Sequence, residues 1–272
     1  MQETKEWIGR VRINYSFTTQ HVPSQCMRRR KSQLLALAPA HDKAIQHFVN
    51  TQIDANYHAA VVRQIRALRE VVYRSEGFWH QDNCRYEHYD SRAWHLALKS
   101  SSSQDLVGCI RVMYFMEGES FPPAESILEI GGIRIDDNKL RDVYLEVIRH
   151  RIYDVREKRK PFCYVGGLAI NQDGRKVGHG ALLGLAVNAL SRIIGDAEGL
   201  TFAHNSRQAA SMFYKLGGYP LGGGALTTFQ CTSHKSAGQL IGLHSLNVSD
   251  NIERIVKALK TALKQEKVIA PS

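Results

Sequence analysis

The fold is decided by residues 162–194, which read FCYVGGLAI, NQDG, RKVGH and GALLGLAVNALSRII in that order. The apolar run Phe162–Ile170 predicts a strand. The segment Asn171–Gly174 predicts a turn, because Asn and Asp side chains bond to their own backbone. The apolar segment Gly180–Ile194 predicts a helix, and Leu200–Ala203 predicts a second short strand. This alternation of strand and helix indicates an α/β or α+β fold.

The rest of the chain extends this unit. Trp94–Lys99 and Leu106–Phe115 predict two strands joined by a polar turn, so the sheet is expected to be mixed. Ile127–Ile135 predicts a further strand or an extended segment. Apolar periodicity predicts four more helices: about 59–76, Leu140–Lys158, Gln208–Leu216 and Ser249–Lys267. We therefore expect a mixed central sheet flanked by helices, with a final core strand at Leu226–Cys231.

Changes in pattern along the chain suggest three parts. Residues 1–40 show weak periodicity and are predicted to be an N-terminal extension. Residues 41–232 hold the predicted sheet and are expected to form the main domain. Residues 233–272 are predicted to be a C-terminal extension with an amphipathic helix, whose apolar face is Ile252, Val256, Leu259 and Leu263.

The composition is that of a globular protein, with 43% hydrophobic and 23% charged residues. No apolar run is long enough to span a membrane, and the first residues lack the apolar segment of a signal peptide. The five cysteines form no CxxC pair and the twelve histidines form no HExxH, which argues against disulfides and against a metal site. The sequence thus predicts a cytoplasmic protein without a metal.

The net charge of +10 predicts an attraction to phosphates. Nucleic acid, anionic lipid, coenzyme A and an acidic carrier protein all remain open on charge alone. No helix-turn-helix, zinc-finger or RNA-recognition signature is present, so nucleic acid is the least favoured of these partners.

A candidate phosphate-binding loop lies at Arg175–Gly180, between the predicted strand and the predicted helix. A helix N-terminus offers unpaired amides and partial positive charge, which suit a pyrophosphate. Gly178 and Gly180 have no Cβ, so a ligand can approach the main chain closely, and Arg175 and Lys176 add positive charge. Two other phosphate motifs are excluded, since GxxxxGK is absent and Leu183 stands where GxGxxG requires its third glycine.

Two motifs together resemble the GNAT superfamily of N-acyltransferases. Arg175–Gly180 matches the R/Q-x-x-G-x-G/A loop with which that superfamily binds the coenzyme A pyrophosphate. Phe213–Tyr219 (FYKLGGY) is similar to its closing element LYEKLGF, with Tyr214 on the tyrosine. The motifs occur in the expected order and are separated by about one helix, one strand and one helix.

The resemblance implies acetyl-CoA or a longer acyl-CoA as co-substrate, with an acyl-carrier protein as the alternative donor. Tyr214 would protonate the departing thiolate, and the backbone N–H at or after Leu168 would bind the thioester oxygen. The predicted cofactor-binding residues are Leu168, Ala169, Ile170, Arg175, Lys176, Val177, Gly178, His179, Gly180 and Tyr214.

The upstream half resembles one branch of the superfamily, the autoinducer (acyl-homoserine-lactone) synthases and the long-chain N-acyl amino acid synthases. The matching residues are Leu68, Arg69, Val72, Tyr73, Trp79, Asp90, His95 and the strand segment Val107–Arg111. The resemblance implies that Trp79, Asp90 and Arg111 bind substrate. Arg111 is expected either to pair with Asp90 or to bind a substrate carboxylate.

The general base is not fixed by the sequence. Glu129, Glu125, Asp90 and His95 are candidates, and we take Glu129 as the prediction, although water or positioning alone can suffice. The predicted activity is transfer of an acyl group from a thioester to the amine of a small molecule. The alternatives are a lactone or N-acyl amino acid synthase with long-chain donors, a non-catalytic acyl-CoA-binding module and a nucleic-acid-binding protein.

Overall fold

The computed structural model describes most of the chain. The described residues are 5–8, 11–14, 32–40, 42–76, 89–100, 103–116, 121–131, 133, 135, 137–176, 178–204, 209–222, 228–230, 237–244, 250–265 and 267–271. Among them, no helix is long and apolar enough to cross a membrane.

Ten of the described strands form one mixed sheet, in the order β10-β11-β8-β7-β6-β5-β3-β12-β4, with β9 paired to β11. Their bounds are β3 Ser32–Leu37, β4 Asn50–Ile53, β5 Trp94–Ser100, β6 Leu106–Phe115, β7 Phe162–Ile170, β8 Glu198–His204, β9 Tyr219–Pro220, β10 Thr228–Gln230, β11 Ala237–Leu243 and β12 Lys267–Ala270. The strands β1 (Lys5–Ile8) and β2 (Val11–Asn14) pair with each other. The predicted antiparallel hairpin is present as β5 and β6.

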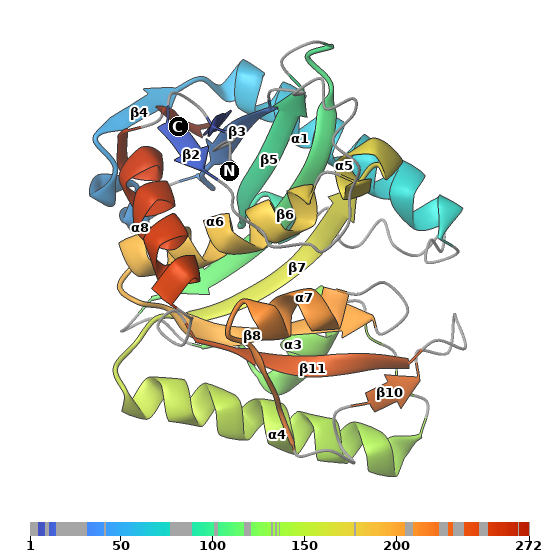
Figure 1. Ribbon diagram of the computed structural model, residues 1–272. Coiled ribbons are helices and arrows are strands. Elements are labelled where there is room, and N and C mark those ends of the chain that lie inside the picture. The colour runs from blue at the N-terminus through green and yellow to red at the C-terminus, as the bar shows by residue number, and fades with distance from the viewer. Residues whose placement is uncertain are drawn as a thin grey trace.

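Helices cover both faces of the sheet, as predicted. Their bounds are α1 Ala55–Ser75, α3 Ala124–Gly131, α4 Asn138–Glu157, α5 Gln172–Lys176, α6 His179–Ile193, α7 Ala209–Lys215 and α8 Asp250–Gln265, and a short 3-10 helix spans Lys43–His47. Figure 1 shows α6, α7 and α8 together in front of the sheet, with α4 along its lower edge. Hydrophobic clusters join α6, α7 and α8 to one face, and α1, α3 and α4 to the other.

The sequence predicted that both ends of the chain form extensions outside the main domain, and the structure differs from this prediction. β3 lies within residues 1–40, yet it pairs with β5 inside the main sheet. β12 lies within residues 233–272, and it pairs with both β3 and β4. The predicted apolar face of α8 is buried against the core at Val256, Leu259 and Leu263. The ranges 1–40 and 233–272 therefore both contribute to the domain, because their apolar residues complete its sheet and its core.

Two local predictions were wrong. The segment Ile127–Ile135, predicted as a strand or an extended segment, begins within helix α3, because Ala124, Ile127 and Leu128 lie at helical spacing and are buried together. The segment Asn171–Gly174, predicted as a turn, leads into the short helix α5. There the Asn171 side chain accepts a hydrogen bond from the Gly174 N–H at 2.7 Å, so the expected Asn bond starts a helical turn.

The parallel strands β7 and β8 pair over only part of their length. The register runs from Phe162 opposite Glu198 to Val165 opposite Thr201, and no pairing between them follows among the described residues. Beyond this point β7 continues beside β6 and β8 continues beside β11. The sheet therefore splays open between residues 166–170 and residues 202–204 (Figure 1).

A buried carboxylate fixes the closed end of this pair. The Glu198 side chain is 5% exposed and accepts bonds from Arg151 at 3.1 Å, Lys158 at 3.0 Å and Lys160 at 2.6 Å. Burial raises the pKa of Glu198, but the bonds from Lys160 and Lys158 outweigh it and lower this pKa to about 2. Glu198 thus ties α4 and the segment before β7 to the start of β8.

We predict that Glu198→Gln lowers the free energy of unfolding by on the order of 3 kcal/mol, because it leaves the buried Arg151 guanidinium without its charged partner. Glu146→Gln is the matched control, since the Glu146 side chain is 76% exposed and pairs with Arg149 at the surface. The control should change stability by less than about 1 kcal/mol. Denaturant unfolding at neutral pH measures both, and equal losses would contradict the role given to Glu198.

Candidate functional site

A β-bulge in β7 lies where the sheet opens. Arg111 is opposite Gly166 and Cys109 is opposite Ala169, so two residues of β7, Gly167 and Leu168, face the single residue between Cys109 and Arg111. Gly167 has a φ of +64°, a conformation that side chains disfavour. This bulge was not predicted from the sequence, although the Gly166–Gly167 pair within a predicted strand is a signal that could have indicated it.

The predicted cofactor residues of β7 begin within this bulge, at Leu168, and continue after it. Leu168 packs against the hydrophobic cluster beneath α6 and α7, and its carbonyl accepts a hydrogen bond from the Tyr73 hydroxyl at 3.3 Å. Ala169 and Ile170 are buried. Because pairing with β8 has ended, the main chain around Leu168 has a strand partner only on the β6 side among the described residues.

The predicted phosphate loop is the junction between α5 and α6. Gly178 is the N-cap of the 15-residue helix α6, has a φ of +79° and provides no side-chain cap. A Cβ placed on Gly178 would meet nothing within 4 Å. The first amides of α6 therefore begin beside open space. Lys176 ends α5, and Val177 lies outside the described residues.

Two loop side chains are already engaged within the protein. The Arg175 guanidinium pairs with Glu76 at the end of α1 and donates from Nε to the Ile170 carbonyl at 3.1 Å. His179 is buried, and its Nε2 lies 3.2 Å from the Ser32 hydroxyl of β3. Burial also lowers the pKa of His179, which favours the neutral ring. Gly180 lies near Met212 of α7 and is half-buried.

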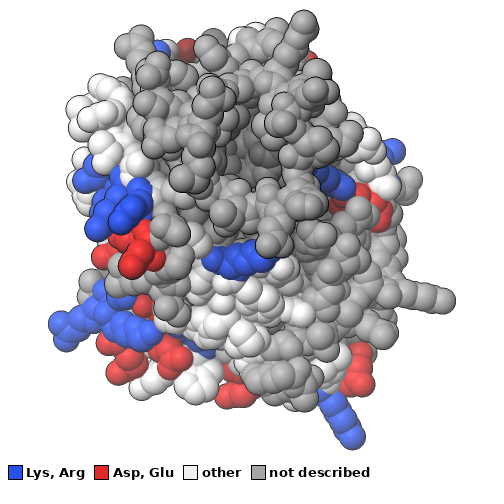
Figure 2. Space-filling view, viewed as in Figure 1, with Lys and Arg blue, Asp and Glu red and all other residues white. Residues whose placement is uncertain are grey.

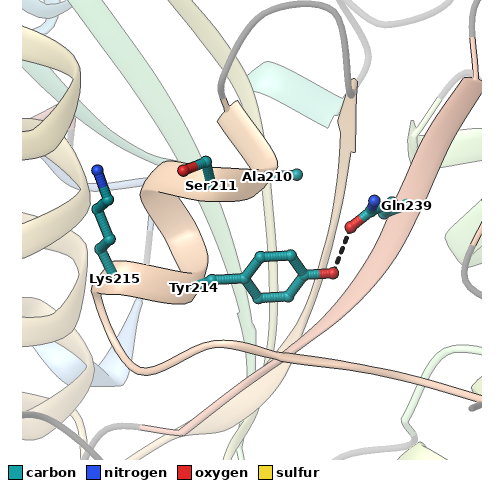
Figure 3. Close-up of a pocket in the computed structure, with 5 residues that line it drawn as sticks. All are labelled: Ala210, Ser211, Tyr214, Lys215 and Gln239. Carbon is teal, nitrogen blue, oxygen red and sulfur yellow. Dashed lines mark hydrogen bonds between the residues drawn. The ribbon is translucent and has the colours of Figure 1, made fainter. Parts of the chain in front are cut away.

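The Tyr214 side chain points from α7 toward β11. Figure 3 shows its ring extending to Gln239, and its hydroxyl donates a short hydrogen bond to the Gln239 side-chain oxygen. The two residues line an open pocket together with Ala210, Ser211 and Lys215. Tyr214 packs against the same hydrophobic cluster as Leu168. The sequence carried no signal for Gln239, which lies in the range predicted as an extension.

A buried charged network lies on the opposite face, behind the bulge. Asp90 is 2% exposed and accepts bonds from Arg69 at 2.9 Å, Arg111 at 3.2 Å and Arg66 at 3.1 Å. The pairing of Arg111 with Asp90, one of two alternatives considered for Arg111, is present. Arg111 also donates to the Ile130 carbonyl of α3 at 3.0 Å. A Cβ on Gly167 would lie 3.4 Å from the Arg69 guanidinium, so the network supports the bulge directly.

Burial and charge set the protonation states of this network. Burial raises the pKa of Asp90, but Arg69 and the other positive neighbours outweigh burial and lower it, so Asp90 is a carboxylate. Burial lowers the pKa of His95 to about 3, with Arg69 adding to the effect. His95 is therefore neutral, and its Nε2 lies 2.9 Å from the Asp90 carbonyl.

The four candidates for the general base differ in their exposure and in their ion pairs. Asp90 and His95 are buried, and Asp90 is committed to arginines. Glu125 pairs with Arg149 at 2.6 Å. Glu129 lies on the exposed side of α3, the helix whose last residue, Gly131, packs on Tyr164 of β7 and Phe202 of β8. Glu129 therefore stays the prediction for the base.

Trp79 lies outside the described residues, and those residues contain no cluster of His, Cys, Asp or Glu that could hold a metal.

No protein-family model and no curated protein matches this sequence. Several solved structures are similar to this chain at low sequence identity. FeeM, an N-acyl amino acid synthase from uncultured soil microbes, is 13% identical over 79% of this chain and 92% of its own, with a TM-score of 0.47. NAA60 of Arabidopsis thaliana, solved in complex with acetyl-CoA, is 11% identical over 79% and 98%, with a TM-score of 0.44. The mosquito arylalkylamine N-acetyltransferase like 5b is 12% identical over 78% and 99%, with a TM-score of 0.46.

We predict that His95 makes the protein lose stability as the pH falls. The folded pKa of His95 is about 3, below the value of 6.5 of an exposed histidine. Below pH 6.5 the unfolded chain binds a proton that the folded chain excludes, which favours unfolding by up to about 1.4 kcal/mol per pH unit. His95→Gln should therefore show a shallower loss between pH 6.5 and 4 in denaturant titrations. Parallel curves for the two proteins would contradict this.

Proposed function

We propose that this protein is an N-acyltransferase that moves an acyl group from a coenzyme A thioester to the amine of a small molecule. One observation carries the proposal: β7 and β8 separate after Val165 and Thr201, and the bulge at Gly167 lies at that opening. A parallel pair that parts in this way ends the main-chain hydrogen bonds between its two strands, so the polar groups of a ligand can bond to the strand edges at the opening.

The pyrophosphate of the donor would lie at the N-terminus of α6. The helix dipole and its first amides favour an anion there, and the open space at Gly178 allows phosphate to approach the main chain. Arg175 would contribute its positive charge while Glu76 holds its position. The pantetheine chain would then run between β7 and β8 toward the bulge.

The thioester carbonyl would lie at the bulge. When the amine nitrogen attacks the carbonyl carbon, the oxygen becomes an oxyanion, and the backbone N–H at or after Leu168 would donate to it. As the carbon–sulfur bond breaks, the thiolate would take the proton of the Tyr214 hydroxyl. The attacking amine would lose its proton to Glu129 or to water, a step that contributes on the order of 10²- to 10⁴-fold when a base is well placed.

The surface charges also bear on the partner. On the face shown in Figure 2, basic and acidic side chains lie next to each other over α8 and below it. Where Figure 2 shows side chains by charge, they form no single-sign basic stripe of the kind that follows a nucleic-acid backbone. An isolated pyrophosphate at a helix terminus fits such a mixed surface better.

A second candidate is an acyl-CoA-binding module without catalysis, favoured by one observation. The Tyr214 hydroxyl already donates to Gln239 and would have to turn that hydrogen toward the sulfur. Thiol release distinguishes the two functions. The purified protein is incubated with acetyl-CoA, palmitoyl-CoA or palmitoyl-acyl-carrier protein and a panel of amines that includes amino acids. Amine-dependent thiol release and a product of the expected mass would support the enzyme, whereas donor binding without thiol release would support the module.

We predict that Gly178→Val weakens coenzyme A binding at least tenfold while the protein stays folded. A branched side chain fills the space at Gly178 and disfavours its positive φ. Gly195→Val is the matched control, because Gly195 follows the other end of α6 with a φ of +87°. Titration calorimetry measures the affinity of both variants for coenzyme A, and equal affinities would contradict a phosphate site at Gly178.

We predict that Tyr214→Phe lowers kcat by on the order of 10²-fold and leaves donor affinity nearly unchanged, because the proton is needed only as the thiolate leaves. The ring remains in place, so the melting temperature should hardly move. Tyr153→Phe serves as control, since Tyr153 is 59% exposed on α4. Steady-state thiol release measures the effect. An unchanged kcat would remove Tyr214 from the mechanism, and a change in KM alone would make it a binding residue.

A further inference from the structure

We propose that Gln239 is a positioning residue that holds the Tyr214 hydroxyl and stabilises its phenolate after the proton has left; this rests on the function proposed above. Gln239 lies on β11 directly opposite Ala203 of β8, so the strand that carries it is the immediate neighbour of one that borders the opening. The backbone of Gln239 is held by the sheet, whereas Tyr214 reaches it from the next layer.

The surroundings make this contact specific. Tyr214 and Gln239 are both half-buried, and among the described residues they are the facing polar pair of the pocket between α7 and β11 (Figure 3). The neighbouring Ala210 is buried, while Ser211 and Lys215 are exposed on the outer side of α7. The residues on either side of Gln239, Gly238 and Leu240, are buried and fix its direction.

A glutamine suits a tyrosine that must give away a proton. Before the reaction, the Gln239 oxygen accepts the phenol hydrogen and fixes the ring. When the O–H bond breaks and the proton joins the departing sulfur, a phenolate oxygen remains, and burial of Tyr214 disfavours that charge. A half-turn of the amide brings its N–H group to the phenolate, because the side chain carries both an acceptor and a donor. A proton from water then restores the phenol.

Two substitutions separate the donor from the acceptor. Gln239→Leu keeps the approximate shape without polar atoms, and we expect kcat to fall about tenfold, the effect of one hydrogen bond to a charged group. Gln239→Glu places a carboxylate beside the phenolate, and we expect a fall of about a hundredfold at pH 8 because of like-charge repulsion. As the pH falls and that carboxyl gains a proton, it can donate, so the deficit of Gln239→Glu should shrink. KM for the donor should stay within about twofold in both variants.

The decisive measurement repeats both substitutions in the Tyr214→Phe background. If Gln239 acts through Tyr214, neither substitution lowers the remaining kcat by more than about twofold there. Equal losses in the two backgrounds, or a wild-type kcat in both single variants, would overturn the proposal. Thiol release that depends on Tyr214 but not on Gln239 would reject this inference alone. A wild-type protein without amine-dependent thiol release would reject the proposed function and this inference with it.

Discussion

The short pairing of β7 with β8 is the constraint on which the rest of the structure depends. Four residue pairs join the two strands, from Phe162 and Glu198 to Val165 and Thr201. At the closed end, Glu198 forms ion pairs with basic side chains of α4 and of the segment before β7. At the open end, the bulge at Gly167 turns β7 away. The opening is thus held between a fixed point and a defined change in strand direction.

The elements on the two faces of the sheet act on that opening through different interactions. On one side, the N-terminus of α6 presents backbone amides, and the partial charge of a helix terminus needs no side chain to attract an anion. On the other side, Asp90 and its arginines are buried beside Gly167. A buried ion network of this kind costs desolvation energy, and the loss of one partner would leave a buried charge uncompensated. We interpret it as support for the bulge, which would keep the proposed oxyanion donors in place.

Sequence patterns predicted the fold well where one periodicity dominated. The strands β5, β6 and β7 and the helices α4 and α6 were predicted because their apolar residues repeat regularly. The segment 127–135 was predicted as a strand or an extended segment, although it begins within a helix, because a short apolar run does not distinguish the two periods. β12 was missed because a four-residue strand at the end of an amphipathic helix carries almost no pattern. Short motifs singled out Gly178 and Tyr214 as candidates, whereas Gln239 and Glu76 depend on tertiary contacts between distant segments, which no local pattern encodes.

The place of β12 has a consequence for biosynthesis. β12 lies in parallel between β3 and β4, although both of those strands leave the ribosome long before it. Until residues 267–270 emerge, β3 and β4 present edges that can pair with other chains. The sheet of a nascent chain therefore stays incomplete until β12 has been synthesised. Contacts between segments so far apart in sequence also form slowly.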